Sequence, residues 1–285
     1  MSENNEKKVW FITGASSGFG RALAEEALAN GDRVAATARK PEVLRDLIEQ
    51  YPDSALAVRL DVTNLEDVKN AISEAVKEFG RIDVLVNNAG YALVGAIEET
   101  SDEQIRRQFD TNLFGVLNVT REALPILRQQ KSGHIVNIGS NVGFAAMPSL
   151  GIYSATKFAL EGVSEALAAE VAAHGIKTTL VEPGPFRTDF GARGVFAENP
   201  LPQAYPSPAQ LAESFQKFKN IAGDPVKAVR VIIEAVESDD PPFRLPLGAT
   251  AFETVEAKLE QVKREISVWR TRASATNFDV AADAR

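Results

Sequence analysis

Short apolar runs alternate with longer segments of helical periodicity along most of the chain. The apolar runs predict seven strands, at 9–12, 33–39, 55–60, 82–86, 133–138, 176–181 and 243–247. Between them, apolar residues recur every three or four positions and predict helices at 21–29, 42–50, 64–79, 101–130, 152–173, 225–237 and 251–270. This alternation favours an α/β fold with a doubly wound, seven-stranded parallel sheet covered by helices on both faces.

The strand–helix rhythm breaks once, over residues 186–223, which are rich in glycine, proline and aromatic residues. A short helix near 207–219 is the only regular element that we expect there. We therefore predict one domain over residues 1–285, with a core at about 8–247. The insertion at 186–223 precedes the last helix of the core, and a C-terminal helix covers about 251–270.

Several residues predict where individual helices begin, bend or end. Thr63 or Asn64 is expected to cap the helix at 64–79, and Gly80 to end it. Pro125 lies inside the helical pattern at 101–130 and is expected to kink or shorten it.

Composition and net charge limit the functional classes to which this chain can belong. The chain is 45% hydrophobic and 25% charged, as is usual for a soluble globular protein. It has no cysteine and only two histidines, so we expect no metal site. A net charge of −8 argues against nucleic-acid binding. The polar N-terminus and the lack of an apolar run of roughly 20 residues favour a cytoplasmic protein without membrane contact.

A glycine-rich stretch, residues 13–20, joins the first predicted strand to the first helix. Gly14, Gly18 and Gly20 would let the backbone turn tightly and approach a pyrophosphate, which the N-terminus of the helix attracts. The hydroxyls of Ser16 and Ser17 can add donors. The spacing differs from the usual G-x-G-x-x-G, so a plain structural turn stays an alternative at this point.

Tyr153 and Lys157 form the most informative local pattern, because residues four apart share one helix face. A nearby ammonium favours the phenolate and would lower the tyrosine pKa from about 10, giving a usable general acid–base. A surface tyrosine beside a solvated lysine is the alternative.

Asp61, Asn88, Ser140 and Pro183-Gly184 follow predicted strands, so they are expected at the sheet edge where ligands bind.

These motifs together resemble the short-chain dehydrogenase/reductase family over about residues 8–240. The glycine turn, residues 87–90, Asn112, Ser140, the Tyr153-x-x-x-Lys157 pair and Pro183-Gly184 stand in that family's order and spacing. The later chain looks similar to the hydroxysteroid- and retinol-dehydrogenase-like branch. Gly139, where a serine is frequent, and the long insertion depart from the pattern without touching the catalytic set.

The resemblance implies a Rossmann fold and a catalytic set of Asn112, Ser140, Tyr153 and Lys157. Tyr153 would donate a proton to a carbonyl oxygen, and Ser140 would hydrogen-bond that oxygen. Lys157 would bind the nicotinamide ribose and hold down the Tyr153 pKa. Asn112 would support a water beside Lys157 in a proton relay. The reverse direction would oxidise an alcohol with the same groups.

A second set of residues is expected to bind the cofactor. The resemblance adds adenine contacts, a segment on the adenosine side and a nicotinamide-side wall to the glycine turn and the Tyr–Lys pair. The set is Gly14, Ser16, Ser17, Gly18, Phe19, Gly20, Arg39, Asp61, Val62, Asn88, Ala89, Gly90, Tyr153, Lys157, Pro183, Gly184, Phe186 and Thr188.

The end of the second predicted strand indicates which cofactor binds. Sites for NAD usually carry an acid there to bind the ribose 2′-hydroxyl, but this chain has Thr37, Ala38, Arg39 and Lys40. Arg39 could instead pair with a 2′-phosphate bidentately, which favours NADP(H). A solvated charge at the end of a strand is the alternative interpretation of Arg39.

The hypothesis that follows is an NADP(H)-dependent oxidoreductase acting on an apolar small molecule. A cofactor-binding sensor or scaffold without turnover is the main alternative, and an epimerase or dehydratase of nucleotide sugars is disfavoured by glycine spacing and length.

Family resemblance implies a homodimer or homotetramer through helices at 112–130 and 152–173. The substrate pocket is expected from 142–149 and from a mobile lid at 186–220, with hinges at Gly191 and Gly194. Its apolar candidates are Phe144, Met147, Phe186, Phe190 and Phe196.

Overall fold

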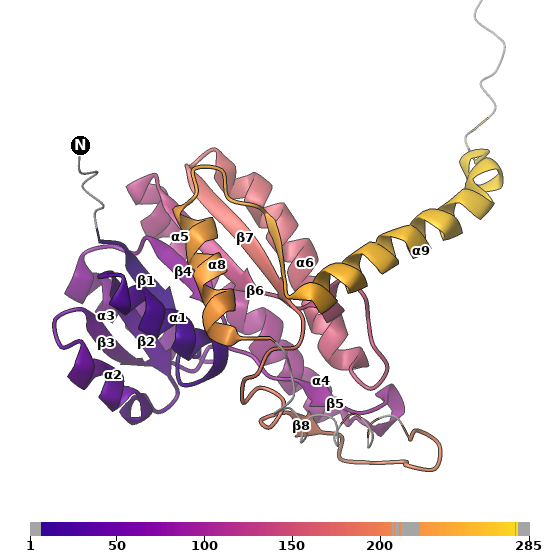
Figure 1. Ribbon diagram of the computed structural model, residues 1–285, viewed down its shortest axis with the longest axis horizontal. Helices are drawn as coiled ribbons and strands as arrows, with labels where there is room; N and C mark the ends of the chain where they lie inside the picture. The colour runs from indigo at the N-terminus through magenta and orange to yellow at the C-terminus, as the bar shows by residue number, and fades with distance from the viewer. Residues whose placement is uncertain (1–6, 207, 209–210, 212–222, 277, 279–285) are drawn as a thin grey trace, which may run out of the picture.

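The computed structural model describes residues 7–206, 208, 211, 223–276 and 278. Within these residues, seven parallel strands form one sheet in the order β3-β2-β1-β4-β6-β7-β9, with helices on both faces (Figure 1). The predicted doubly wound parallel sheet is thus confirmed. The strands are β1 (Val9–Ile12), β2 (Arg33–Ala38), β3 (Ala55–Arg59), β4 (Val84–Asn87), β6 (Gly133–Ile138), β7 (Ile176–Pro183) and β9 (Arg244–Leu247).

Two apolar cores lie on opposite faces of this sheet. In β1, Trp10 and Ile12 face the core under α1 and α8, whereas Val9 and Phe11 face the core under α3 and α5. All four side chains are fully buried. The α-helices of the described residues are α1 (Gly18–Ala29), α2 (Arg45–Gln50), α3 (Leu65–Phe79), α4 (Asp102–Phe109), α5 (Gly115–Gln130), α6 (Gly151–Ala172), α8 (Pro225–Glu237) and α9 (Ala249–Ser274).

The strand order reverses between β1 and β4. Strands β1, β2 and β3 follow one another toward one edge, and β4, β6, β7 and β9 follow toward the other. In an open α/β sheet, a crevice forms at such a switch point, outside the carboxyl ends of the strands. The glycine-rich turn after β1 and the polar segment after β4 therefore lie side by side at this edge, as their hydrogen bonds show.

Local helix signals work as the sequence predicts. The side chain of Asn64 accepts hydrogen bonds from the backbone N–H groups of Glu66 and Asp67, at 2.9 and 3.1 Å, and caps α3. Gly80 ends α3 with a φ of 79°, a conformation that glycine adopts without steric cost. Pro125 does not shorten α5, which runs to Gln130.

The helical region predicted at 101–130 is not one helix. It divides into α4, a π-helical turn at Asp110–Phe114, and α5. Apolar periodicity did not reveal this turn, because one extra residue per turn shifts the pattern only locally. Such turns often lie at functional sites, and this one carries Asn112.

The described part of the insertion is tied to the body by a second, two-stranded sheet that the sequence did not predict. In it, β5 (Leu93–Val94) pairs in parallel with β8 (Val195–Phe196). Next to it, the backbone N–H of Leu201 donates to the buried Glu99 carboxylate at 2.6 Å. The short helix expected near 207–219 falls mostly outside the described residues and stays a prediction.

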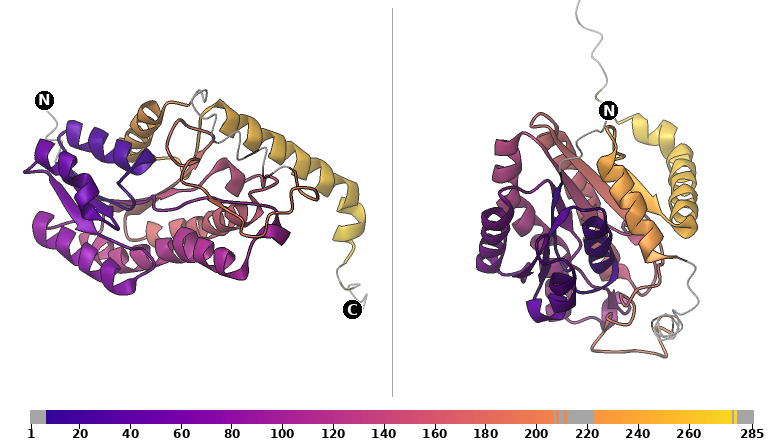
Figure 2. Two further views of the ribbon diagram at one scale, coloured as in Figure 1. Left: turned by 90° about the horizontal axis from the view of Figure 1, so that it is seen from below. Right: turned by 60° about the vertical axis from the view of Figure 1, so that its left-hand side comes forward.

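The C-terminal helix, α9, is longer than the predicted range 251–270. Gly248, with a φ of 83°, precedes it, and only Ala251 of the helix is buried. The base of α9 contacts β9 and the turn at Asn141–Gly143. From there the helix extends away from the sheet and its covering helices (Figure 2).

Candidate active site

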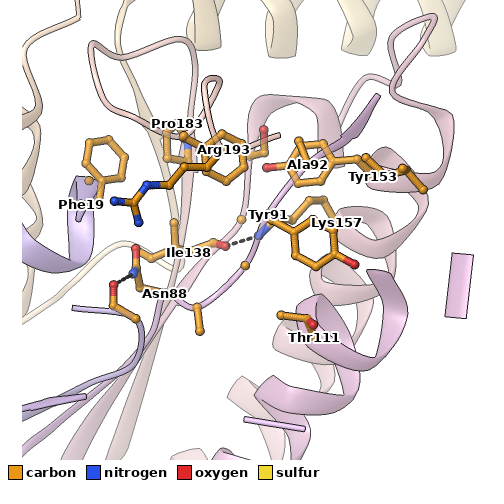
Figure 3. A pocket seen from close by; sticks show the side chains of 18 of the residues that line it. Phe19, Asn88, Tyr91, Ala92, Thr111, Ile138, Tyr153, Lys157, Pro183 and Arg193 are labelled. Atoms are coloured by element: carbon orange, nitrogen blue, oxygen red, sulfur yellow. Dashed lines mark hydrogen bonds between the residues drawn. The ribbon is translucent and has the colours of Figure 1, made fainter. Parts of the chain in front are cut away.

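A cavity of about 1210 Å³ opens at the carboxyl edge of the sheet (Figure 3). Its walls come from the turn after β1, the ends of the other central strands, α6, the insertion and the first turns of α9. Segments that are more than 200 residues apart in sequence thus share one cavity, which is large enough for an extended ligand.

The glycine-rich turn forms one end of this cavity. Gly14 and Gly18 have φ values of 67° and 57°. A Cβ on Gly20 would lie 2.4 Å from the Asn88 amide nitrogen and 2.5 Å from the Gly14 carbonyl oxygen. Ser17, the N-cap of α1, makes no side-chain cap hydrogen bond, so the first N–H groups of α1 are left for another acceptor. This cradle fits the pyrophosphate of a dinucleotide.

Thr13 and Asn88 hold the turn in place. The Asn88 side-chain amide donates to the carbonyl oxygens of Thr13 and Gly14, at 2.9 and 3.1 Å. In return, the Thr13 hydroxyl accepts from the backbone N–H groups of Asn88 and Ala89, at 2.9 and 3.0 Å. Asn88 therefore joins the β4 end to the glycine turn, and Thr13 is a supporting residue that the site prediction did not name.

Ser140, Tyr153 and Lys157 come together on another wall. The turn after β6 supplies Ser140, and consecutive turns of α6 supply Tyr153 and Lys157. The last two are each only 6% exposed, so the alternative of a surface tyrosine and a solvated lysine does not fit. The Lys157 ammonium donates to the Ile138 carbonyl oxygen at 2.6 Å and lies 5.8 Å from the centre of the Tyr153 ring (Figure 3).

Burial disfavours the charged forms of Tyr153 and Lys157, so it shifts the pKa of each group. It raises the pKa of Tyr153 to about 12, against a smaller lowering by a hydrogen bond with Ser140. It lowers the pKa of Lys157 to about 8, against a smaller raising by the Glu161 carboxylate. Desolvation of the phenolate therefore outweighs the lowering contact with Ser140, so the net shift of the Tyr153 pKa is upward, and the expected lowering by Lys157 stays a prediction.

Asn112 lies beneath the cavity wall rather than on it. Its amide nitrogen donates to the Tyr91 carbonyl oxygen at 2.9 Å and to the Thr156 hydroxyl at 3.3 Å. Its amide oxygen accepts from the Tyr91 backbone N–H at 3.1 Å. Both amide hydrogens are thus used, and the side chain joins the π-helical turn to the segment after β4 and to α6.

The ends of β2 and β3 form the other part of the cleft. Arg39 is exposed, and its guanidinium forms no ion pair with a described residue. The Asp61 carboxylate is held in place by Thr63, whose N–H and hydroxyl donate to it at 3.0 and 2.7 Å. Ala38 and Arg39 line the cavity at the end of β2, the position where an acid would bind a ribose hydroxyl.

Aromatic side chains cover the opposite rim. Phe19 and Phe186 meet edge to face with ring centres 5.1 Å apart, and Phe190 lies 5.9 Å from the Tyr153 ring. Figure 3 shows the Arg193 side chain reaching from the insertion toward Phe19 and Asn88. This wall therefore combines an apolar surface beside Tyr153 with one cation directed at the glycine-turn end.

Most of the predicted site residues line this one cavity. They are Gly14, Ser16, Ser17, Gly18, Phe19, Arg39, Asp61, Val62, Asn88, Ala89, Gly90, Ser140, Tyr153, Lys157, Pro183, Gly184, Phe186 and Thr188. Gly20 and Asn112 support the wall from behind. Of the apolar candidates, Met147, Phe186 and Phe190 line the cavity, but Phe144 and Phe196 do not. The prediction that Phe196 lines the substrate pocket is therefore wrong, because β8 holds it at the surface.

Several lining residues are not among the predicted site residues, including Tyr91, Thr111, Arg193 and Thr254. Of these, only Arg193 could have been predicted from the sequence, because it is a cation between two glycines of the insertion. The others reach the cavity through long-range packing.

A charged cluster lies behind Lys157. Arg244 of β9 donates to the carboxylates of Glu161 and Glu182, and to the more exposed Glu165 at 3.2 Å. Glu182 is fully buried, and burial raises the pKa of Glu161 to about 7. The Arg244 guanidinium thus compensates two buried carboxylates, one of which, Glu161, lies one helical turn after Lys157.

The described residues contain no group of three histidine, cysteine, aspartate or glutamate side chains placed to hold a metal ion. None of their helices is both long enough and apolar enough to cross a membrane.

Residues 8–195 match the family profile described as short chain dehydrogenase. Oxidoreductase BOA17 of Botryotinia fuckeliana is 40% identical over 271 residues, covering 94% of this chain and 99% of that protein. A 3-ketodihydrosphingosine reductase of Bacteroides thetaiotaomicron is 38% identical over 250 residues, covering 85% and 88%. A short-chain dehydrogenase of Streptomyces avermitilis, solved by crystallography, superposes with a TM-score of 0.88 at 43% identity, covering 96% and 100%.

Two more distant crystal structures hold a cofactor. One from Burkholderia phymatum, in complex with NAD, has a TM-score of 0.80, 27% identity, and covers 91% of this chain and 95% of that one. One from Burkholderia cenocepacia, in complex with NADP, has a TM-score of 0.73, 29% identity, and covers 92% and 97%. Relatives of this fold therefore bind either nucleotide.

Proposed function

The chain belongs to the short-chain dehydrogenase/reductase family, and on that premise we propose that it is an NADP(H)-dependent enzyme interconverting a carbonyl and an alcohol. The observation that carries the proposal is the single cavity shared by the glycine turn, Ser140, Tyr153 and Lys157. Apolar rings beside Tyr153 favour an apolar small molecule as substrate. The related 3-ketodihydrosphingosine reductase, which by its name acts on a carbonyl compound, is consistent with that class.

The cofactor would be held along the whole carboxyl edge of the sheet. The glycine turn and the start of α1 would bind the pyrophosphate, and Arg39 the 2′-phosphate. Asp61 and Val62 would contact the adenine, and Pro183, Gly184, Phe186 and Thr188 would line the nicotinamide side. When bound, NADP(H) supplies or accepts the hydride.

The proton chemistry belongs to this chain's own residues. The Tyr153 hydroxyl would donate its proton to the carbonyl oxygen, and the Ser140 hydroxyl would donate a hydrogen bond to the same oxygen. With a pKa of about 8, Lys157 is mostly charged at neutral pH, so it can stabilise the phenolate that forms. Asn112 would act as a positioning residue, through its bonds to Tyr91 and Thr156.

A cofactor-binding sensor without turnover remains the second candidate. It would need the same nucleotide cleft but not the buried Ser140, Tyr153 and Lys157 set. We favour the enzyme because burying a tyrosine and a charged lysine together costs desolvation free energy. A purely structural role for the two side chains would not offset that cost. The hydroxysteroid- and retinol-dehydrogenase-like branch and assembly through α5 and α6 stay predictions.

Replacing Arg39 with aspartate tests the cofactor assignment. We expect NADPH to bind about tenfold more weakly or worse, because a charge-assisted hydrogen bond to the 2′-phosphate becomes a repulsion. NADH affinity should change less. Isothermal titration with both nucleotides measures the effect, and Arg45→Asp, on α2 outside the cavity lining, controls for the change of charge. A native protein that uses NADH as efficiently as NADPH would sink the assignment.

Phe190 and Phe196 together test the lid predicted over 186–220, of which residues 207, 209–210 and 212–220 lie outside the described residues. Phe190 contacts Tyr153, so Phe190→Ala should alter substrate preference more than cofactor affinity. Phe196→Ala, which removes a similar ring outside the cavity, should leave both unchanged. Hydrogen exchange over 187–194 should slow when NADPH and substrate bind together. Slow exchange in the free protein, with an unchanged substrate profile for Phe190→Ala, would make the segment structural.

A further inference from the structure

Helix α9 carries apolar side chains that nothing in the described chain covers. Phe252, Leu259, Ile266 and Trp269 are 50%, 53%, 59% and 60% exposed. The helix is 26 residues long, but only its base contacts β9 and the turn at Asn141–Gly143 (Figure 1). An isolated helix of this length gains little stability in water, because most helical stability comes from packing an apolar face.

These apolar residues follow a heptad repeat. Their separations alternate between three and four residues over seven positions, so they form one narrow stripe along the helix. The stripe consists of Phe252, Val255, Leu259, Val262, Ile266, Trp269 and Ala273. A surface helix that packs on a globular core has a wider apolar face, whereas a strict heptad stripe is typical of a helix that pairs with another helix.

The charges of α9 argue against a lipid surface as its partner. The helix carries four glutamates and five basic residues, mixed along its length: Glu253, Glu256, Glu260, Glu265, Lys258, Lys263, Arg264, Arg270 and Arg272. An interfacial membrane helix concentrates cations on its polar face, which attract anionic lipid headgroups. Here alternating signs flank the stripe, which is the arrangement that selects a helical partner.

We propose that the α9 stripe binds the α9 stripe of a second copy of this chain, antiparallel and centred between Glu260 and Gln261. In that register Phe252 meets the partner's Trp269, Val255 meets the partner's Ile266, and Leu259 meets the partner's Val262. Every large apolar residue of the stripe then has an apolar partner. Phe252 is half exposed, so the base of α9 leaves this end of the stripe open.

The flanking charges match the same register. Lys258 faces the partner's Glu265, and Glu256 faces the partner's Lys263. Two-fold symmetry repeats each pair, so four opposite-charge contacts border the seam. Lys263 now pairs with Glu260 at 3.6 Å, and Gln261 donates to Glu265 at 2.7 Å. These contacts are exposed and weak, so they can be exchanged for contacts across the seam.

Other arrangements place like charges together. Moving the antiparallel register by one heptad sets Lys258 against the partner's Lys258, or Glu265 against the partner's Glu265. A parallel pair sets Lys258 against the partner's Lys263 and Glu265 against the partner's Arg270, so a repulsion offsets the attraction, whereas the antiparallel register has opposite charges at every flanking pair. Charge complementarity therefore selects both the second copy and the antiparallel direction.

Sedimentation velocity of the full chain gives the first test. Leu259→Glu places a charge in the seam and should remove one step of association, whether from dimer to monomer or from tetramer to dimer. Val268→Glu is the matched control, because Val268 lies on the same helix, off the stripe, and is 78% exposed. Equal masses for the two variants would overturn the proposal.

Charge reversal gives a second test that does not depend on packing. Lys258→Glu or Glu265→Lys alone turns two symmetry-related attractions into repulsions, so we expect association about tenfold weaker or worse at low salt. The double variant, carrying both changes, restores opposite charges and should recover association. Failure of the double variant to recover would contradict this register.

Disulfide trapping determines whether the two helices pair parallel or antiparallel. The chain has no native cysteine, so only the introduced cysteines can form disulfides. Co-expressed Val255→Cys and Ile266→Cys chains should form a mixed disulfide dimer, with little of either homodimer. Homodimers trapped by Val255→Cys alone would show a parallel pair and overturn the antiparallel one. A chain that stays uncrosslinked, or that binds phosphatidylserine vesicles through α9 instead, would also overturn it.

Discussion

Tyr153→Phe is expected to lower kcat for carbonyl reduction at least about a hundredfold, the lower end for loss of a general acid. The tyrosine is almost fully buried beside Phe190, so the phenylalanine ring can take the same place. Only the hydroxyl that faces Ser140 is lost. NADPH affinity should stay within a few-fold of the native value, and single-turnover oxidation of bound NADPH would show the loss in the chemical step.

Tyr91→Phe is the matched control, because it removes a tyrosine hydroxyl from the same cavity. The Tyr91 hydroxyl has no role in the proposed proton transfer, so activity should remain near native. If Tyr153→Phe retains near-native turnover with a carbonyl substrate, or if both variants lose activity equally, Tyr153 is not the acid.

Arg244→Ala is expected to lower the free energy of unfolding by about 3 kcal/mol, the low end for breaking a buried ion pair. The low end applies because Arg244 is one third exposed. The substitution leaves the buried Glu161 and Glu182 carboxylates without their cation and removes the guanidinium that stacks on Phe144 and Phe243. Urea unfolding, followed by circular dichroism, measures the change.

Arg230→Ala provides the control, because Arg230 also forms a two-point ion pair, but on the surface with Glu26. It should cost less than about 1 kcal/mol. Equal losses for the two arginine variants would contradict the assigned importance of the buried cluster.

The Arg244 effect should also depend on pH. The folded-state pKa of Glu161 is raised from 4.5 to about 7, so this group stabilises the fold most below about pH 4.5, and that contribution is lost as pH rises through 7. Arg244 holds the Glu161 pKa down, so removing Arg244 should destabilise the protein more at pH 8 than at pH 5.5. A loss independent of pH would show that packing, rather than charge, dominates.

Local signals in the sequence were enough to predict the sheet and most of its helices. The four apolar residues of β1 are buried on both faces, as a central parallel strand requires, and Asn64 and Gly80 bound α3. Tyr153 and Lys157 share one helix face, which their spacing alone decides in a helix.

The remainder depends on contacts between distant segments. The pairing of β5 with β8 rests on two residues in each strand, too few for a periodic signal. The shift of the Tyr153 pKa depends on how deeply the side chain is buried, which its sequence neighbours do not reveal. Arg244 meets Glu161 and Glu182 only because β9 lies next to β7 in the sheet. The heptad stripe of α9 was visible in the sequence, but its exposure was not.

Oxidation of NADPH, followed at 340 nm with a panel of apolar ketones, aldehydes and quinones, tests whether the protein reduces a carbonyl with this cofactor. Parallel reactions with NADH and with Tyr153→Phe belong in the same measurement. We expect alcohol to form in an amount equal to the NADPH consumed, a higher kcat/KM with NADPH than with NADH, and little turnover by Tyr153→Phe. Tight binding of NADPH without oxidation by any member of the panel would contradict the proposed activity and favour a cofactor-binding sensor.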